Sequence, residues 1–271
     1  MNSQQQSGAP DIAHASRRCS ELIHRVSISQ SIVSSALEVP RVSSALEDVA
    51  RDYHLSDESG IRALLKEYSI IVPVDPGKPL DSEKVISMMA EGLAKQTAVN
   101  AEIVVSAAAV ILSHSTADDI FTEACKLAID LDNDKWISRL DLDSKVSLRL
   151  LKDKGATGVF SEELKRYKVR LAGKSLPNRA KILFERVPIA LHPDIPSADL
   201  RHFKMSTLSE VDDLRKEIVH GNGLPGTDPA SGVKYAGFLH EAANTAIRSV
   251  MTAYRIPMDV NYWRSLFPSE K

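Results

Sequence analysis

An arginine and a histidine near the end of the chain have the types and spacing that favour chemistry. Arg215 and His220 lie in the stretch LRKEIVHGNG, residues 214–223, with four residues between them. A guanidinium stays charged and its fork matches a phosphate, whereas a histidine with an ordinary pKa of about 6.5 exchanges protons near neutral pH. The pair therefore has the composition of a site that binds a phosphate and transfers a proton.

The helix that contains this pair is predicted to place Arg215 at the edge of its buried face. At 100° per residue, the apolar residues at 214 and 218 fall within about 60° of Val211, and Arg215 lies about 40° from it. Lys216 and Glu217 point away from that face, where a merely solvated arginine would more often be found. The pattern therefore favours a partly buried arginine.

The direction of His220 is left open by the sequence. In an ideal helix it would lie about 180° from Val211, on a different side from Arg215. Gly221 is a natural left-handed residue just past a helix end, so His220 is expected at or next to the last helical position. The simpler alternative is that a cation in the last turn complements the helix dipole and marks the end of the helix.

The rest of the chain has helical patterns almost throughout, so the predicted fold class is all-α. A linker rich in proline, residues 72–80, divides a helical segment over residues 1–75 from a helical bundle over 76–271, and the first 10 residues are expected to be disordered. The N-terminal segment is predicted to hold two short helices that meet at a bend at Pro40. Only residues 69–74, SIIVPV, could form a strand.

Helix boundaries in the bundle follow from caps, glycines and prolines. Asn100 is expected to cap one helix, and Ser209 with Asp212 has the form of a capping box that restarts another. The expected helices cover residues 81–98, 100–130, 144–153, 161–174, 176–187, 199–220 and 232–255.

Composition excludes several classes of protein. With a formal net charge of −2 and 5% aromatic residues, the chain has neither an overall basic field nor many base-stacking side chains. Cys19 and Cys125 are the only cysteines, which excludes a disulfide framework. The longest apolar candidate, residues 101–114, is too short to span a membrane and is read as a buried helix. We expect a soluble, cytoplasmic protein without a signal peptide.

In this all-helical context, Arg215 and His220 followed by Gly-Asn resemble the signature of the HEPN superfamily, in which an arginine, four to six residues and a histidine close one helix. An apolar run that leads to an acidic residue, here Asp118 or Asp119, resembles a second helix of that family. Residues 232–255 fit its closing helix. The resemblance covers roughly residues 84–256. Lys216 stands where catalytic members typically have a small polar residue.

The resemblance implies a metal-independent ribonuclease whose site forms between two copies of the chain. The neighbouring 2′-OH of RNA acts as the nucleophile, a base takes its proton, and a cation stabilises the charge on the phosphorus centre. His220 is assigned as general acid/base and Arg215 as phosphate clamp. No cofactor and no metal are expected. The residues expected to bind or orient the substrate are Asn222, Lys216, Asp118 and Asp119.

Other functions remain as alternatives. A non-catalytic HEPN-like module for dimerisation or partner binding is favoured by Lys216 and by the nearly neutral charge. An active member could act as a toxin or phage-defence effector, and a neutralising protein partner is then one possible partner besides RNA and a second copy of the chain. Residues 42–68 have the rhythm of a helix–turn–helix, but few basic residues occupy the presumed recognition helix.

The remaining notable residues have a simpler structural interpretation. The basic segment 165–174, with Arg179 and Lys181 beyond it, would hold an RNA backbone or would form a solvated helix face. His114 and His240 lie in long helices and could meet the site, although a lone helical histidine is more often structural. Trp136 is expected to be a packing anchor.

Overall fold

The computed structural model describes residues 11–37, 47–52, 82–137, 148–190, 203–220 and 229–266. Every regular element in these ranges is a helix, which confirms the all-α fold class. Residues 47–52 are also helical. The labelled helices are α1 (Ile12–Ala36), α4 (Ser82–Leu131), α5 (Asn133–Ile137), α6 (Leu148–Ala172), α7 (Leu176–Phe184), α9 (Met205–His220), α10 (Pro229–Tyr254) and α11 (Val260–Leu266).

The central element is α4, a single helix of 50 residues. The predicted helix start at Asn100 is wrong, because α4 runs through this position without a break. The side chain of Asn100 instead accepts a hydrogen bond from Gln96 Nε2 at 3.1 Å on the helix surface. Strong helix formers, including Ala and Lys, flank this position, so the preference of asparagine for caps does not interrupt the helix.

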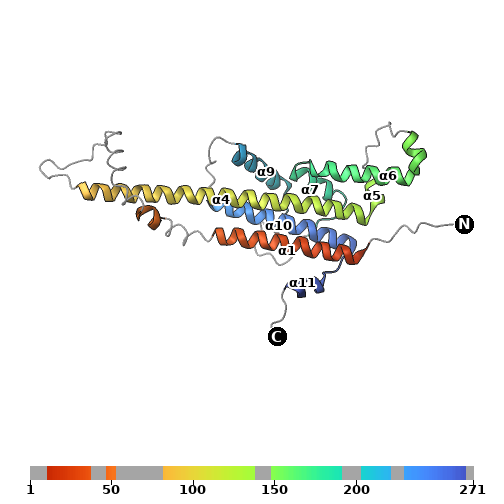
Figure 1. Ribbon diagram of the computed structural model, residues 1–271, viewed down its shortest axis with the longest axis horizontal. Coiled ribbons are helices and arrows are strands. Elements are labelled where there is room, and N and C mark those ends of the chain that lie inside the picture. Colours follow the sequence, from red (N-terminus) through yellow and green to blue (C-terminus); the bar gives the residue numbers. More distant parts are fainter. Residues whose placement is uncertain are drawn as a thin grey trace.

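Two helices pack along α4 on one side. Figure 1 shows α10 and α1 running beside α4, and α10 makes the most extensive contact with it. Small side chains permit this close approach: a Cβ added at Gly232 of α10 would lie 1.7 Å from Ser106 Oγ of α4. The shared core includes Cys19, Leu22, Val26, Ala117, Phe121, Ala124, Leu239, Ala243 and Ala246.

Helix α1 belongs to the same hydrophobic core as α4 and α10, although the sequence assigns it to a separate N-terminal segment. It is one helix from Ile12 to Ala36. The predicted bend at Pro40, the linker at 72–80 and the possible strand at 69–74 lie outside the described residues. The division into two domains therefore stays a prediction.

On the other side of α4 lie α7 and α9, which also contact each other. The predicted end of a helix at residue 153 agrees with a break at Gly155, which has φ +65° inside α6, a conformation that only glycine adopts readily. The predicted capping box is wrong. Helix α9 begins at Met205, Ser209 Oγ donates to Met205 O at 3.2 Å, and Asp212 is buried against another helix.

By length and composition alone, residues 87–131 of α4 would be apolar enough to cross a membrane. A core helix of a soluble protein passes the same test, and side chains such as Ile120, Phe121 and Ile129 of this helix are fully buried in the core. The predicted absence of a membrane segment is not tested by this feature.

Candidate functional site

A polar pocket of about 590 Å³ lies between α4, the turn from α6 to α7, and α9. We call it the Arg215 pocket. Its lining contains five cationic and three acidic side chains, so charged groups dominate it. The lining residues are His114, Ser115, Asp118, Asp119, Thr122, Lys126, Ala172, Gly173, Lys174, Ser175, Leu176, Arg179, Asp212, Arg215 and Lys216.

A buried arginine fixes the wall that α6 and α7 form. Arg179 is 2% exposed and forms an ion pair with Asp118 of α4. Its Nη1 also donates to the carbonyl of Ala172 at 2.9 Å, a group at the end of α6 that has no partner within its own helix. Burial lowers the pKa of Arg179, partly offset by the charge of Asp212. Arg179 therefore ties the α6–α7 turn to α4.

A second polar chain links α4 to α9. His114 Nε2 lies 3.0 Å from Asp212 Oδ1, and Lys216 Nζ lies 2.9 Å from the other oxygen of this carboxylate. Burial lowers the pKa of His114, although Asp212 acts in the opposite direction. Burial raises the pKa of Asp212, but the hydrogen bonds from Lys216 and His114 outweigh it, and the net shift is downward. A neutral His114 therefore donates from Nε2 to an ionised Asp212.

The remaining charges of the pocket do not cancel. Asp119 pairs with Arg25 at 3.0 Å, and Lys126 pairs with Glu123 at 2.8 Å. Arg215 is half-buried, and neither it nor the exposed side chain of Lys174 forms an ion pair or hydrogen bond within the described part of the chain. The N-terminal end of α7 adds a favourable helix dipole at the same place. The pocket therefore suits an anion.

The burial of α9 agrees with the helical pattern of its sequence. Arg215 lies at the edge of the buried face, while Lys216 and Glu217 are exposed. Lys216 does not stand free to hold a substrate, because it contacts Asp213 at 2.8 Å as well as Asp212. The hydrogen bond to Asp213, followed by that to Asp212, raises the pKa of Lys216.

His220 is the last residue of α9, as expected, but it is exposed and does not line the Arg215 pocket. On a regular helix it lies about 140° around the axis and about 7.5 Å along it from Arg215. Lys216 lies between the two, about 40° from His220. The structure thus brings Arg215, Lys216, Asp118 and Asp119 together and leaves His220 beyond the rim. Asn222 lies outside the described residues.

Four residues of the pocket received no role, or a different one, from the sequence. His114 was read as a structural histidine, Asp212 as a helix cap, and Arg179 and Lys174 as part of a basic surface. Part of that surface is occupied by ion pairs, because Lys168 pairs with Asp130, Arg166 with Glu163, and Arg179 is buried. The one local sequence signal for these contacts is the spacing of Asp212 and Lys216, which places both residues on one face of the helix.

Within the described residues, no group of three or more His, Cys, Asp or Glu side chains has the arrangement to hold a metal ion. The pocket offers cationic side chains of the kind that suits a phosphate, and His220 beyond its rim is of the kind that suits proton transfer. Comparison of the chain with models of known protein families, with characterised proteins and with solved structures finds no match.

Proposed function

We propose that this chain is a HEPN-type endoribonuclease that binds RNA through the Arg215 pocket and cleaves it without a metal ion. One observation carries the proposal. The arginine of the R-x4-H motif lies half-buried in a pocket with other cations and has no partner among the described residues. A guanidinium that is not neutralised is suited to clamp a phosphate.

In the proposed reaction, Arg215 and Lys174 hold one phosphate in the pocket, and the RNA strand passes Lys216 towards His220. The 2′-OH attacks the phosphorus, His220 takes up its proton, and the bond to the 5′-oxygen breaks. His220, now protonated, returns this proton to the leaving 5′-oxygen, so the products are a 2′,3′-cyclic phosphate and a 5′-OH. Asn222 orients the imidazole, and a second copy of the chain completes the cleft, as the HEPN resemblance implies.

The test is cleavage of single-stranded RNA in excess chelator. We expect Arg215→Ala and His220→Ala each to reduce the rate by about 100-fold or more, the range for loss of an acid/base group or of a charge that stabilises the transition state. Arg166→Ala and His14→Ala are matched controls, because both residues are exposed and lie outside the pocket. They should retain the wild-type rate within about twofold. Cleavage that survives both site substitutions would reject the assignment.

A second candidate is a non-catalytic HEPN-like module for dimerisation or partner binding. It is favoured by the separation of Arg215 and His220 around α9 and by the ion pairs that occupy Lys216. Such a module would bind RNA or a protein without cleaving RNA in the same assay. Growth arrest on expression that is lost in His220→Ala would instead support the ribonuclease and a role as a toxin or defence effector.

A further inference from the structure

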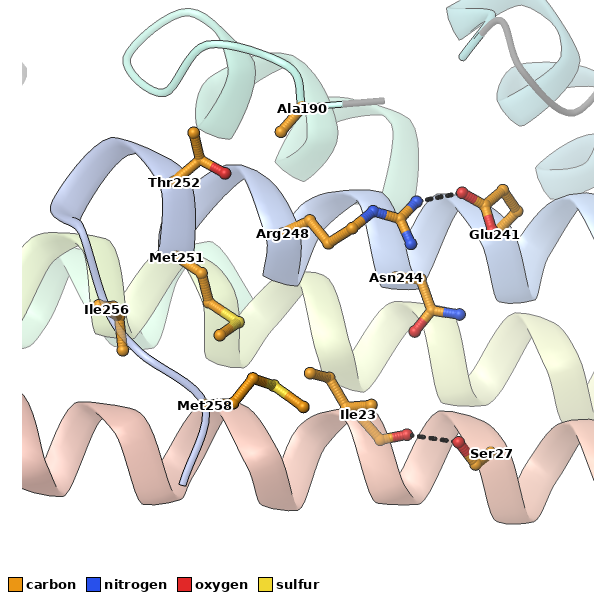
Figure 2. A pocket seen from close by; sticks show the side chains of 10 residues that line it. All are labelled: Ile23, Ser27, Ala190, Glu241, Asn244, Arg248, Met251, Thr252, Ile256 and Met258. Atoms are coloured by element: carbon orange, nitrogen blue, oxygen red, sulfur yellow. Dashed lines mark hydrogen bonds and ion pairs between the residues drawn. The ribbon is translucent and has the colours of Figure 1, made fainter. Parts of the chain in front are cut away.

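A second pocket, of about 720 Å³, lies along α10 on its side towards α1 (Figure 2). We call it the α10 groove. The residues of α10 that line the groove recur at helical spacing, so one face of this helix is open to it. The residues used below are Ile23 of α1, Glu241, Asn244, Arg248 and Met251 of α10, and Met258.

The segment that follows α10 closes one end of the groove. After a turn at Arg255, which has φ +53°, residues 256–259 cross from α10 to α1. Two buried serines of α1 hold this segment: Ser16 Oγ donates to Pro257 O at 2.6 Å, and Asp259 N donates to Ser20 Oγ at 3.1 Å. The closed end is therefore part of the folded structure.

The closed end is apolar. Figure 2 shows Met251 reaching down from α10 and Met258 reaching in from the crossing segment towards Ile23. Both methionine side chains are partly exposed to the groove or to solvent. Methionine sulfur makes favourable contacts with aromatic rings, and its flexible chain adapts to their shape. An aromatic body is thus the group that this end accommodates best.

The open end is polar but uncharged as a whole. Arg248 forms an ion pair with Glu241 through Nη2, and the same nitrogen lies 3.2 Å from Thr245 Oγ1. Asn244 points into the groove between α10 and α1, and its amide has no hydrogen bond within the part of the chain that the structure describes. The amide offers one acceptor and two donor hydrogens.

We propose that the α10 groove binds a neutral small molecule with an aromatic body and a carboxamide end. The aromatic ring lies against Met251 and Met258, and the carboxamide exchanges hydrogen bonds with Asn244. The charges of the groove select the polar end of the ligand. An anionic group would be repelled by the carboxylate of Glu241 and a cationic group by Arg248, whereas a neutral amide is repelled by neither. A groove of this size lies within the range of small-molecule sites.

Three probes that differ only in their polar end test this inference: 3-phenylpropanamide, 3-phenylpropionate and 3-phenylpropylamine. Their dissociation constants would be measured on the full chain by NMR titration of the methionine methyl groups. We expect the amide to bind at least about fivefold more tightly than either charged probe. Binding should shift the signals of Met251 and Met258 and leave that of Met205, on α9, in place.

Two variants separate hydrogen bonding from charge. Asn244→Leu should remove the preference for the amide. Glu241→Gln keeps the size of the side chain but frees the charge of Arg248, so it should move the preference to 3-phenylpropionate by at least about fivefold. Circular dichroism and thermal unfolding would establish that both variants fold. No binding by the wild type at millimolar concentration, or the same order of the three probes in Glu241→Gln, would overturn the inference.

Discussion

The Arg215 pocket and the α10 groove each contain an arginine that is paired with a carboxylate, yet they offer different chemistry. Arg179 pairs with Asp118 in the first, and Arg248 pairs with Glu241 in the second. The pocket keeps Arg215 as an additional cation without a partner among the described residues, whereas the groove keeps only a neutral amide. The charge that remains after pairing, and not the number of charged residues, determines which ligand each site suits.

The two paired arginines also differ in their burial. The side chain of Arg179 is 2% exposed and that of Arg248 is 26% exposed. Arg179 additionally binds the carbonyl at the end of α6, so it supports the wall of the pocket. Arg248 has solvent as an alternative partner. The two arginines thus differ in burial and in their bonds to the backbone, whereas their carboxylate partners, Asp118 at 39% and Glu241 at 16%, are both partly exposed.

The largest expected effect concerns stability. We expect Arg179→Met to lower the free energy of unfolding by about 3 kcal/mol, because it leaves the helix-end carbonyls of Leu171 and Ala172 without their donor and also removes the ion pair with Asp118. The matched change Arg248→Met should cost about 1 kcal/mol or less, since among the described residues Arg248 bonds only side chains and water can replace it at Glu241. Urea denaturation of the two variants measures the difference. Equal losses would show that the carbonyl bonds of Arg179 add nothing to its stabilising effect.

Two buried histidines extend the comparison to pH. His240 lies near Ser29 Oγ, at 2.9 Å, in the contact of α10 with α1, and burial lowers its pKa to about 4. Between pH 6.5 and 4 the unfolded chain binds this proton and the folded chain does not, so stability falls as the pH falls. The expected loss is about 3 kcal/mol. His114 faces an ionised carboxylate, so its contribution should be smaller.

Urea denaturation at several pH values measures this effect as the difference between the wild type and His240→Gln. The variant should lose less stability on acidification, because glutamine has no proton to gain. His114→Gln should change the pH dependence less than His240→Gln does. A larger change in His114→Gln would mean that Asp212 does not compensate the charge of His114.

A smaller effect is expected within the pocket itself. Lys216 is already paired with two carboxylates, whereas Lys174 has no partner among the described residues. Lys174→Met should therefore weaken the binding of a non-cleavable 2′-O-methyl RNA by about fivefold, and Lys216→Met by about twofold. Fluorescence anisotropy at fixed salt gives both values. The reverse order would show that Lys216 leaves its carboxylates to bind RNA.

The fold class and the position of Arg215 followed from local patterns. The apolar period of α9 placed Arg215 at the edge of the buried face, and Gly221 placed His220 at the helix end. Both depend on residues within one or two turns, for which helical periodicity is informative. The predicted cap at Asn100 was wrong because the helix formers around it extend over many more residues than a cap does.

The composition of the pocket could not be derived in this way. Asp118 and Arg179 are 61 positions apart, and His114 and Asp212 are 98 apart. Their pairing depends on how α7 and α9 dock on α4, which no local pattern encodes. The α10 groove likewise requires the crossing segment at 256–259. The sequence thus indicated single residues of the site, while the ion pairs that decide its remaining charge required the tertiary structure.

The central claim is that Arg215, which has no partner among the described residues, binds RNA phosphate. The most direct measurement compares Arg215→Gln with Arg248→Gln, because each removes one arginine charge from a different pocket. Anisotropy titration with the 2′-O-methyl RNA should show binding weakened by about tenfold or more for Arg215→Gln and unchanged within about twofold for Arg248→Gln. Equal affinities of the two variants, at the same salt concentration, would contradict the account.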